Sequence, residues 1–126
     1  MRIFRCILLA PLAVTMVALA NPAENDAAML KLAAQSGCMA CHTVLPGVKR
    51  ADGLPPIAPA WRDIAIKYRD DPGASERLTR TVMSGSDPRA RHWVGKVSAA
   101  NMPPNAQSVG QADARVLVNW ILVLVP

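Results

Sequence analysis

Two cysteines and a histidine stand close together in the first half of the chain. Cys38, Cys41 and His42 fall within the segment "GCMACHT", and the chain contains three cysteines in all. Two cysteines separated by two residues occur in redox-active disulfides, in halves of zinc sites and at the attachment points of c-type haem. Each of these chemistries needs different companions elsewhere in the chain.

The rest of the sequence distinguishes the three chemistries. A thioredoxin-like dithiol needs a βαβ context, whereas this chain shows helical periodicity and proline-rich loops. A structural zinc site needs four ligands, and His92 is the only histidine outside the motif. Cys-x-x-Cys-His suits haem directly, because two sulfurs on one turn can bond the vinyl groups while the adjacent imidazole reaches the iron. We therefore expect one covalent haem c on Cys38 and Cys41, with His42 as an iron ligand.

The second axial ligand decides whether such a haem moves electrons or binds small molecules. A thioether stabilises ferrous iron and blocks the sixth coordination position, which favours electron transfer. Met102 lies on a stiff irregular segment, since Pro103 and Pro104 exclude helix there, and Asn105 adds a side-chain donor. We expect Met102 to be the ligand and His92 to be an exposed or propionate-side loop residue. The other methionines weighed against Met102 are Met29 and Met83, expected in the core, and Met39, between the two thioethers.

Residues 1–20 are predicted to be a secretory signal peptide. A short basic start, "MRIFR", precedes an apolar run that ends in Ala18-Leu19-Ala20, a small-x-small cleavage signal. The apolar run is shorter than the roughly 20 residues that a spanning helix needs. Cleavage would remove Cys6 and leave a periplasmic domain of residues 21–126 with a formal charge of +3 instead of +5. This mild charge suits docking to an acidic protein patch and is weak evidence for nucleic acid.

Apolar spacing and turn residues predict four helices and no strand. The first is expected to be capped by Asp26 and to end near Gly37, and Pro59 is expected to open the second. Residues 43–59 and 86–107 are predicted to be loops. The expected inward residues are Leu30 and Ala33 in 27–36, Trp61, Ile64, Ala65 and Tyr68 in 60–69, Leu78 and Val82 in 74–85, and Ala112, Val116, Trp120 and Val123 in 111–125.

The sequence resembles the class I cytochromes c, in particular the short monohaem periplasmic electron carriers of bacteria. The segments "GCMACHT", "APAWRDIAIKY", "MPPN" and "LVNWIL" occur in the family's order, over nearly the whole of residues 21–126. The resemblance implies an all-α fold of four to five helices around one covalent haem, with the first and last helices crossing. It also implies that the carbonyl of Pro59 accepts a hydrogen bond from His42, and that Asn105 donates toward the sulfur of Met102.

The resemblance assigns the tryptophans and marks two departures. Trp93 matches a tryptophan that reaches a haem propionate, with a half-buried loop aromatic as the alternative, whereas Trp61 and Trp120 are expected in the core. The loops at 44–59 and 94–101 are longer than in the shortest members. Thr81 stands where many relatives carry a basic residue that points toward a haem propionate. Arg80 or Lys96 is expected either to take over that contact or to be a solvated surface charge.

The expected function is non-enzymatic electron transfer between redox partner proteins, with the iron cycling between Fe(II) and Fe(III). The partners would be an electron donor and an acceptor, such as a dehydrogenase or a terminal reductase or oxidase. The alternative is a haem subunit of a larger periplasmic dehydrogenase, with the two long loops facing the fixed partner. A haem enzyme or gas sensor would need an open sixth coordination position. We expect no membrane span in the mature chain, and a monomer or a subunit of a redox complex.

Overall fold

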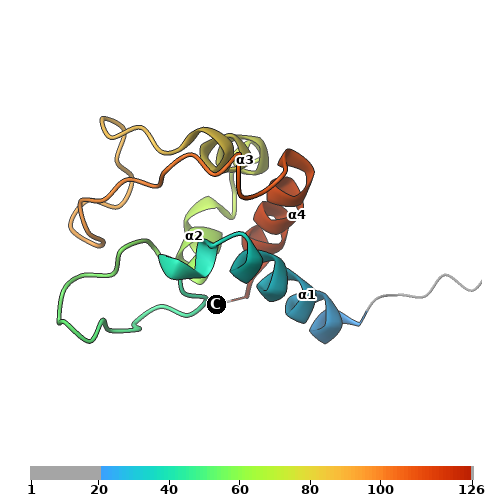
Figure 1. The fold of residues 1–126 in the computed structure, drawn as a ribbon, viewed down its shortest axis with the longest axis horizontal. Helices are drawn as coiled ribbons and strands as arrows, with labels where there is room; N and C mark the ends of the chain where they lie inside the picture. The colour runs from blue at the N-terminus through green and yellow to red at the C-terminus, as the bar shows by residue number, and fades with distance from the viewer. Residues whose placement is uncertain (1–20, 126) are drawn as a thin grey trace, which may run out of the picture.

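The computed structural model describes residues 21–125, and every regular element in that range is helical (Figure 1). The predicted signal peptide lies outside the described residues. The all-α expectation is confirmed. The elements are α1 (Pro22–Gln35), the 3-10 turn η1 (Cys38–Ala40), α2 (Trp61–Tyr68), α3 (Ala74–Ser84) and α4 (Gln111–Leu122).

Helix α1 begins one turn earlier than predicted. Asn21 is the N-cap, its side-chain oxygen accepts a hydrogen bond from the backbone N–H of Ala23 at 3.2 Å, and Pro22 occupies the first helical position. Proline favours that position because its fixed φ already suits the helix. The prediction that Asp26 caps α1 is therefore wrong. The carboxylate of Asp26 instead accepts a hydrogen bond from the indole N–H of Trp120 at 2.7 Å and joins α1 to α4.

Helix α2 begins two residues after the predicted start. Ala60 is the N-cap, so Pro59 stays in the preceding loop. The first backbone N–H groups of α2, from Trp61 and Arg62, donate to the carbonyls of Thr43 and Val44 at 2.9 and 3.2 Å. These donors would otherwise lack partners at a helix start. The segment that follows His42 is thereby held against the start of α2.

Helix α4 buries a different stripe from the predicted one. Ala114, Leu117, Val118 and Ile121 are buried, as is Trp120, which was predicted correctly. The other three predicted positions, Ala112, Val116 and Val123, are exposed. Both stripes recur at helical spacing, and the packing of α4 against α1, α2 and α3 selects the one that faces them.

The core lies where α1, α2 and α4 meet. Trp61 and Trp120 are 2% and 6% exposed, and their rings meet edge to face with centroids 5.6 Å apart. Ala33 of α1 is fully buried in the same cluster, together with Leu117 and Ile121 of α4. The predicted core roles of Trp61 and Trp120 are confirmed. Among the described residues, no helix is both long and apolar enough to cross a membrane.

Two long loops extend from the helical part of the molecule on the same side in Figure 1, as predicted for residues 43–59 and 86–107. Neither of these described segments contains a buried residue. Ser98 joins them, since its backbone N–H donates to the carbonyl of Pro56 at 2.8 Å and its hydroxyl donates to that of Ile57 at 3.2 Å. The loops are therefore held to each other by polar contacts rather than by a core.

Candidate functional site

The cysteine motif forms a tight turn directly after α1. Gly37, with φ of 75°, reverses the chain in a backbone conformation that glycine adopts without strain. The backbone N–H groups of Cys41 and His42 both donate to the carbonyl of Cys38, at 3.3 and 3.1 Å. Both cysteines are free thiols; Cys38 is half-buried and Cys41 is exposed. Burial raises the pKa of the Cys38 thiol above its usual value.

The imidazole of His42 is fixed in orientation and tautomer. Its Nδ1 lies 2.8 Å from the carbonyl oxygen of Pro59, which only accepts, so Nδ1 carries the proton. This is the hydrogen bond that the family resemblance implies. The ring also stacks on Trp61, with centroids 6.0 Å apart. Burial lowers the pKa of His42 despite the opposing effect of the hydrogen bond to Pro59. The result is a neutral imidazole whose Nε2 lone pair is free to bind a metal.

An apolar crevice opens beside this imidazole. Cys38, His42 and Met102 all line it, although Met102 lies 60 positions after His42 in the chain. The other lining residues come from α2, α3 and α4: Trp61, Ile64, Leu78, Thr81, Val82, Leu117, Val118 and Ile121. The crevice brings together the thiol of Cys38, the neutral imidazole of His42 and the thioether of Met102, while Cys41 is exposed on the same turn. Together these are the groups that a covalent c-type haem requires. The residues present therefore fit that group.

The backbone of Met102 is held against the end of α3. Its N–H donates to the hydroxyl of Ser86, and its carbonyl accepts from the N–H of Ser86, both at 3.0 Å. Gly85 makes this approach possible, because a Cβ there would meet the carbonyl oxygen of Met102 at 3.0 Å and Pro104 at 3.1 Å. Gly85 also has φ of 82°, where side chains are strained. The sequence placed Gly85 at the end of the predicted helix 74–85, and its close approach to Met102 was not predicted.

The side chain of Asn105 does not donate toward the sulfur of Met102. Its amide nitrogen donates to the carbonyl of Pro103 at 2.7 Å and to that of Val82 at 3.3 Å, and its backbone N–H also donates to Val82 at 3.0 Å. Two backbone carbonyls within reach take the amide protons in this structure, and donation toward the sulfur in the haem-loaded protein stays a prediction. Asn105 instead ties the segment after Met102 to α3.

Trp93 lies outside the crevice. It is half-buried and lines a separate hollow between the two loops and α2, together with Lys96. The ammonium nitrogen of Lys67 lies 5.3 Å from the centroid of the Trp93 ring, within range of a cation–π contact. Arg80 pairs with Glu76 at 2.7 Å on the exposed surface of α3, which matches a solvated charge.

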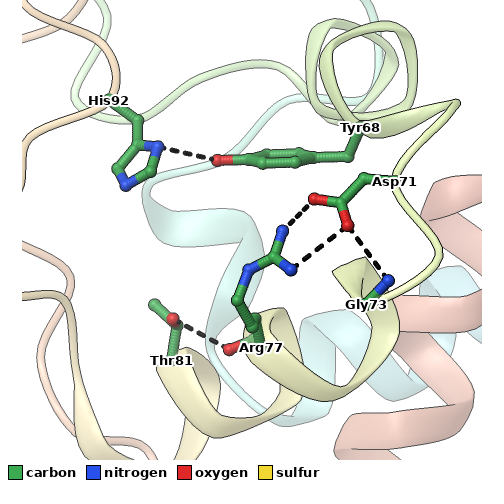
Figure 2. A network of polar contacts seen from close by, with 6 residues as sticks. All are labelled: Tyr68, Asp71, Gly73, Arg77, Thr81 and His92. Carbon is green, nitrogen blue, oxygen red and sulfur yellow. Dashed lines mark hydrogen bonds and ion pairs between the residues drawn. The ribbon is translucent and has the colours of Figure 1, made fainter.

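His92, the rival axial ligand, is exposed and does not line the crevice. Figure 2 shows its ring pointing to the hydroxyl of Tyr68, with Nδ1 and the phenol oxygen 3.2 Å apart. Below Tyr68 in the same view, Arg77 is paired with Asp71. The crevice thus contains one histidine and one methionine, His42 and Met102.

Sequence reasoning also missed the part of the crevice that α4 supplies. Leu117, Val118 and Ile121 line it, and they belong to the stripe that was not predicted to face inward. The signal was present, because Ala114, Leu117, Val118 and Ile121 follow helical spacing. It competed with an equally regular stripe on another face.

Several known proteins are similar to this chain. Cytochrome c-551 of Allochromatium vinosum is 40% identical over 102 residues, which cover 81% of this chain and 92% of the relative. Cytochrome c-551 of Pseudomonas aeruginosa is 30% identical over 108 residues, or 86% of this chain and 85% of the relative. The crystal structure of wild-type Nitrosomonas europaea cytochrome c552 superposes with a TM-score of 0.57 at 35% identity, over 75% of this chain and 96% of that one. No family model matches the chain.

Proposed function

The chain belongs to the class I monohaem c-type cytochromes, and we propose that it is a periplasmic electron carrier with histidine and methionine as axial ligands. The cofactor of the family is one covalently bound haem c. In the proposed assignment Cys38 and Cys41 form the two thioether bonds, and His42 and Met102 bind the iron. The observation that carries the proposal is that His42 and Met102 line one apolar crevice beside Cys38.

Each side chain has a definite task in this proposal. When bound, the haem supplies a one-electron couple between Fe(II) and Fe(III). Pro59 holds the proton of the His42 imidazole on Nδ1 and so keeps Nε2 available. The apolar walls of the crevice exclude water and keep the local dielectric low, which tunes a haem potential. Met102 would supply a thioether, a soft ligand that favours reduced iron, and the proposal gives no side chain a catalytic role.

The remaining assignments are proposals supported by sequence and contacts. Residues 1–20 are proposed to be cleaved on export, leaving residues 21–126 as the haem domain in the periplasm. Trp93 is proposed to contact a propionate, and Asn105 contributes by anchoring the segment that follows Met102. The partners are proposed to be a donor protein and an acceptor protein that exchange single electrons with this chain.

The experiment compares Met102→Ala with His92→Ala in the haem-loaded protein. The wild type should show a sulfur-to-iron charge-transfer band at the red edge of the oxidised spectrum, and strongly upfield-shifted methionine methyl protons when reduced. His92→Ala should keep both signals. Met102→Ala should lose both and should allow ferrous iron to bind carbon monoxide, because its sixth position is open.

Two results would overturn the assignment. Loss of the native sixth ligand in His92→Ala, with Met102→Ala unchanged, would establish bis-histidine ligation and a lower potential. Haem that is freely extracted from the native protein by acid-acetone would disprove the thioether bonds at Cys38 and Cys41.

A further inference from the structure

The net positive charge of residues 21–126 is concentrated in the two long loops. The chain has 14 Lys and Arg against nine Asp and Glu, and Arg2 and Arg5 fall in residues 1–20, which leaves twelve against nine. Segments 44–59 and 86–101 supply the whole excess, because seven cationic side chains balance seven anionic ones in the remainder. The loop charges are Lys49, Arg50, Arg89, Arg91 and Lys96 against Asp52 and Asp87.

Local ion pairs neutralise two of the five loop cations and leave three without an acidic partner among the described residues. Arg50 pairs with Asp52, and Arg89 with Asp87, inside their own turns. Within residues 21–125, Lys49, Arg91 and Lys96 form no ion pair, and all three are exposed. The guanidinium of Arg91 donates to the backbone carbonyl of Ser98 at 3.0 Å, which fixes its position without neutralising it.

The two loops form a single surface rather than two independent ones. Ser98 bonds the second loop to Pro56 and Ile57 of the first, as described above. Between them lies a hollow of about 380 Å³, lined by both loops and by the outer side of α2. A single water needs about 10–15 Å³ in the same measure, so the hollow is large enough to receive side chains of another protein. Lys96 lines the hollow, and Lys49 and Arg91 adjoin its lining residues Val48 and His92.

Exposed apolar side chains accompany these cations. Val48 and Val94 line the hollow and are 52% and 69% exposed, and Leu45 and Leu54 on the first loop are also exposed. An apolar centre with a charged rim is the usual composition of a protein–protein interface. We propose that this two-loop surface, formed by segments 44–59 and 86–101, docks an acidic, partly apolar surface of a redox partner protein. The proposal rests on the carrier function proposed above and specifies the chemistry of the partner.

The position of the surface suits electron exchange. The first loop ends at Pro59, which holds the imidazole of His42. The second loop leads directly to Met102, which lines the crevice. A protein seated on the two-loop surface therefore contacts segments that adjoin His42 and Met102 in the chain. The opposite surface, formed by α1 and α4, lacks a net excess of positive charge.

The test uses small redox reagents as probes of local charge. The reduced haem protein passes one electron to hexacyanoferrate(III), which becomes hexacyanoferrate(II), and stopped-flow absorbance gives the rate. The loop variant combines Lys49→Glu and Lys96→Glu. The control variant combines Lys31→Glu on α1 and Arg115→Glu on α4, two exposed positions with the same change in net charge. At about 0.1 M salt the screening length is about 10 Å, so the reagent responds to nearby charges.

The loop variant should be oxidised about three- to tenfold more slowly than wild type, and the control should remain within about twofold. The cationic oxidant tris(phenanthroline)cobalt(III) should show the opposite trend in the loop variant. Equal slowing of both variants would overturn the docking surface, because electrons would then leave elsewhere. A wild-type protein that lacks the charge-transfer band and a reversible one-electron potential would instead overturn the carrier function itself.

Discussion

The helical part of the chain and its two long loops hold the proposed haem ligands by different means. On the helical side, contacts run continuously from Asp26 through Trp120 and Trp61 to the ring of His42. Two of these rings are almost fully buried. On the loop side, the backbone of Met102 is held by hydrogen bonds to the hydroxyl and the N–H of Ser86, and by the absence of a side chain at Gly85.

This difference separates stability from ligand placement. Burial of large apolar side chains contributes several kcal/mol each, whereas a single hydrogen bond contributes about 1 kcal/mol. Changes in the helical part should therefore act mainly on the free energy of unfolding. Changes in the loops should act mainly on how firmly Met102 stays on the iron. This separation also explains how the loops can be long, and carry the proposed docking surface, without weakening the core.

The largest effect is expected from removal of the haem. The core cluster where α1, α2 and α4 meet comprises five buried residues and the loops bury no residue, so the haem-free chain should lose most of its helix and its cooperative unfolding transition. Circular dichroism of the haem-free and haem-loaded proteins measures this. Near-native helix with a cooperative melt in the haem-free chain would show that the helical part is stable by itself.

The next largest effect is expected from Trp61→Ala. It removes a ring that is 2% exposed and contacts both Trp120 and His42, so the free energy of unfolding should fall by about 3–5 kcal/mol. Trp93→Ala is the loop-side counterpart and should cost less than half as much, because Trp93 is only half-buried. Denaturant unfolding of the haem-loaded variants measures both. Equal losses would contradict the division between core and loops.

Gly85→Ala should act on Met102 more than on the core. An alanine in the positive-φ conformation of Gly85 costs about 1–2 kcal/mol of stability. The new Cβ would also press on the carbonyl oxygen of Met102. Gly95→Ala is a matched control, since Gly95 has φ of 75° and nothing within 4 Å of an added Cβ. We expect the charge-transfer band to weaken and to disappear at lower temperature in Gly85→Ala only. Identical spectra for the two variants would show that the close approach is unimportant.

Ser98→Ala should have the smallest effect on stability. It removes the hydroxyl bond to Ile57 and keeps the backbone bond to Pro56, so the cost should be about 0.5–1.5 kcal/mol. The loop carrying Met102 should nevertheless be held less firmly, and the charge-transfer band should be lost at a lower temperature than in wild type. Ser84→Ala is the control, because that hydroxyl bonds to Arg80 within α3. Ser98→Thr should restore the wild-type behaviour.

The local patterns of the sequence predicted the order of the helices and the cofactor. The spacing of Cys38, Cys41 and His42 predicted a haem attachment turn, and proline and glycine predicted where the loops lie. The core positions of Trp61 and Trp120 were also predicted. These features depend on residues a few positions apart, or on a resemblance carried by short motifs, so no long-range contact is needed to recognise them.

The contacts between distant segments were decided by the fold. Asp26 was predicted to cap its own helix, yet it binds Trp120, which lies 94 residues later. The inward face of α4 depended on which of two regular stripes the other helices cover, and Asn105 found its acceptors on Val82 and Pro103. Ser98 joins two loops whose proximity no local pattern announces. In each case a polar or apolar group had several acceptable partners, and packing determined which of them came within reach.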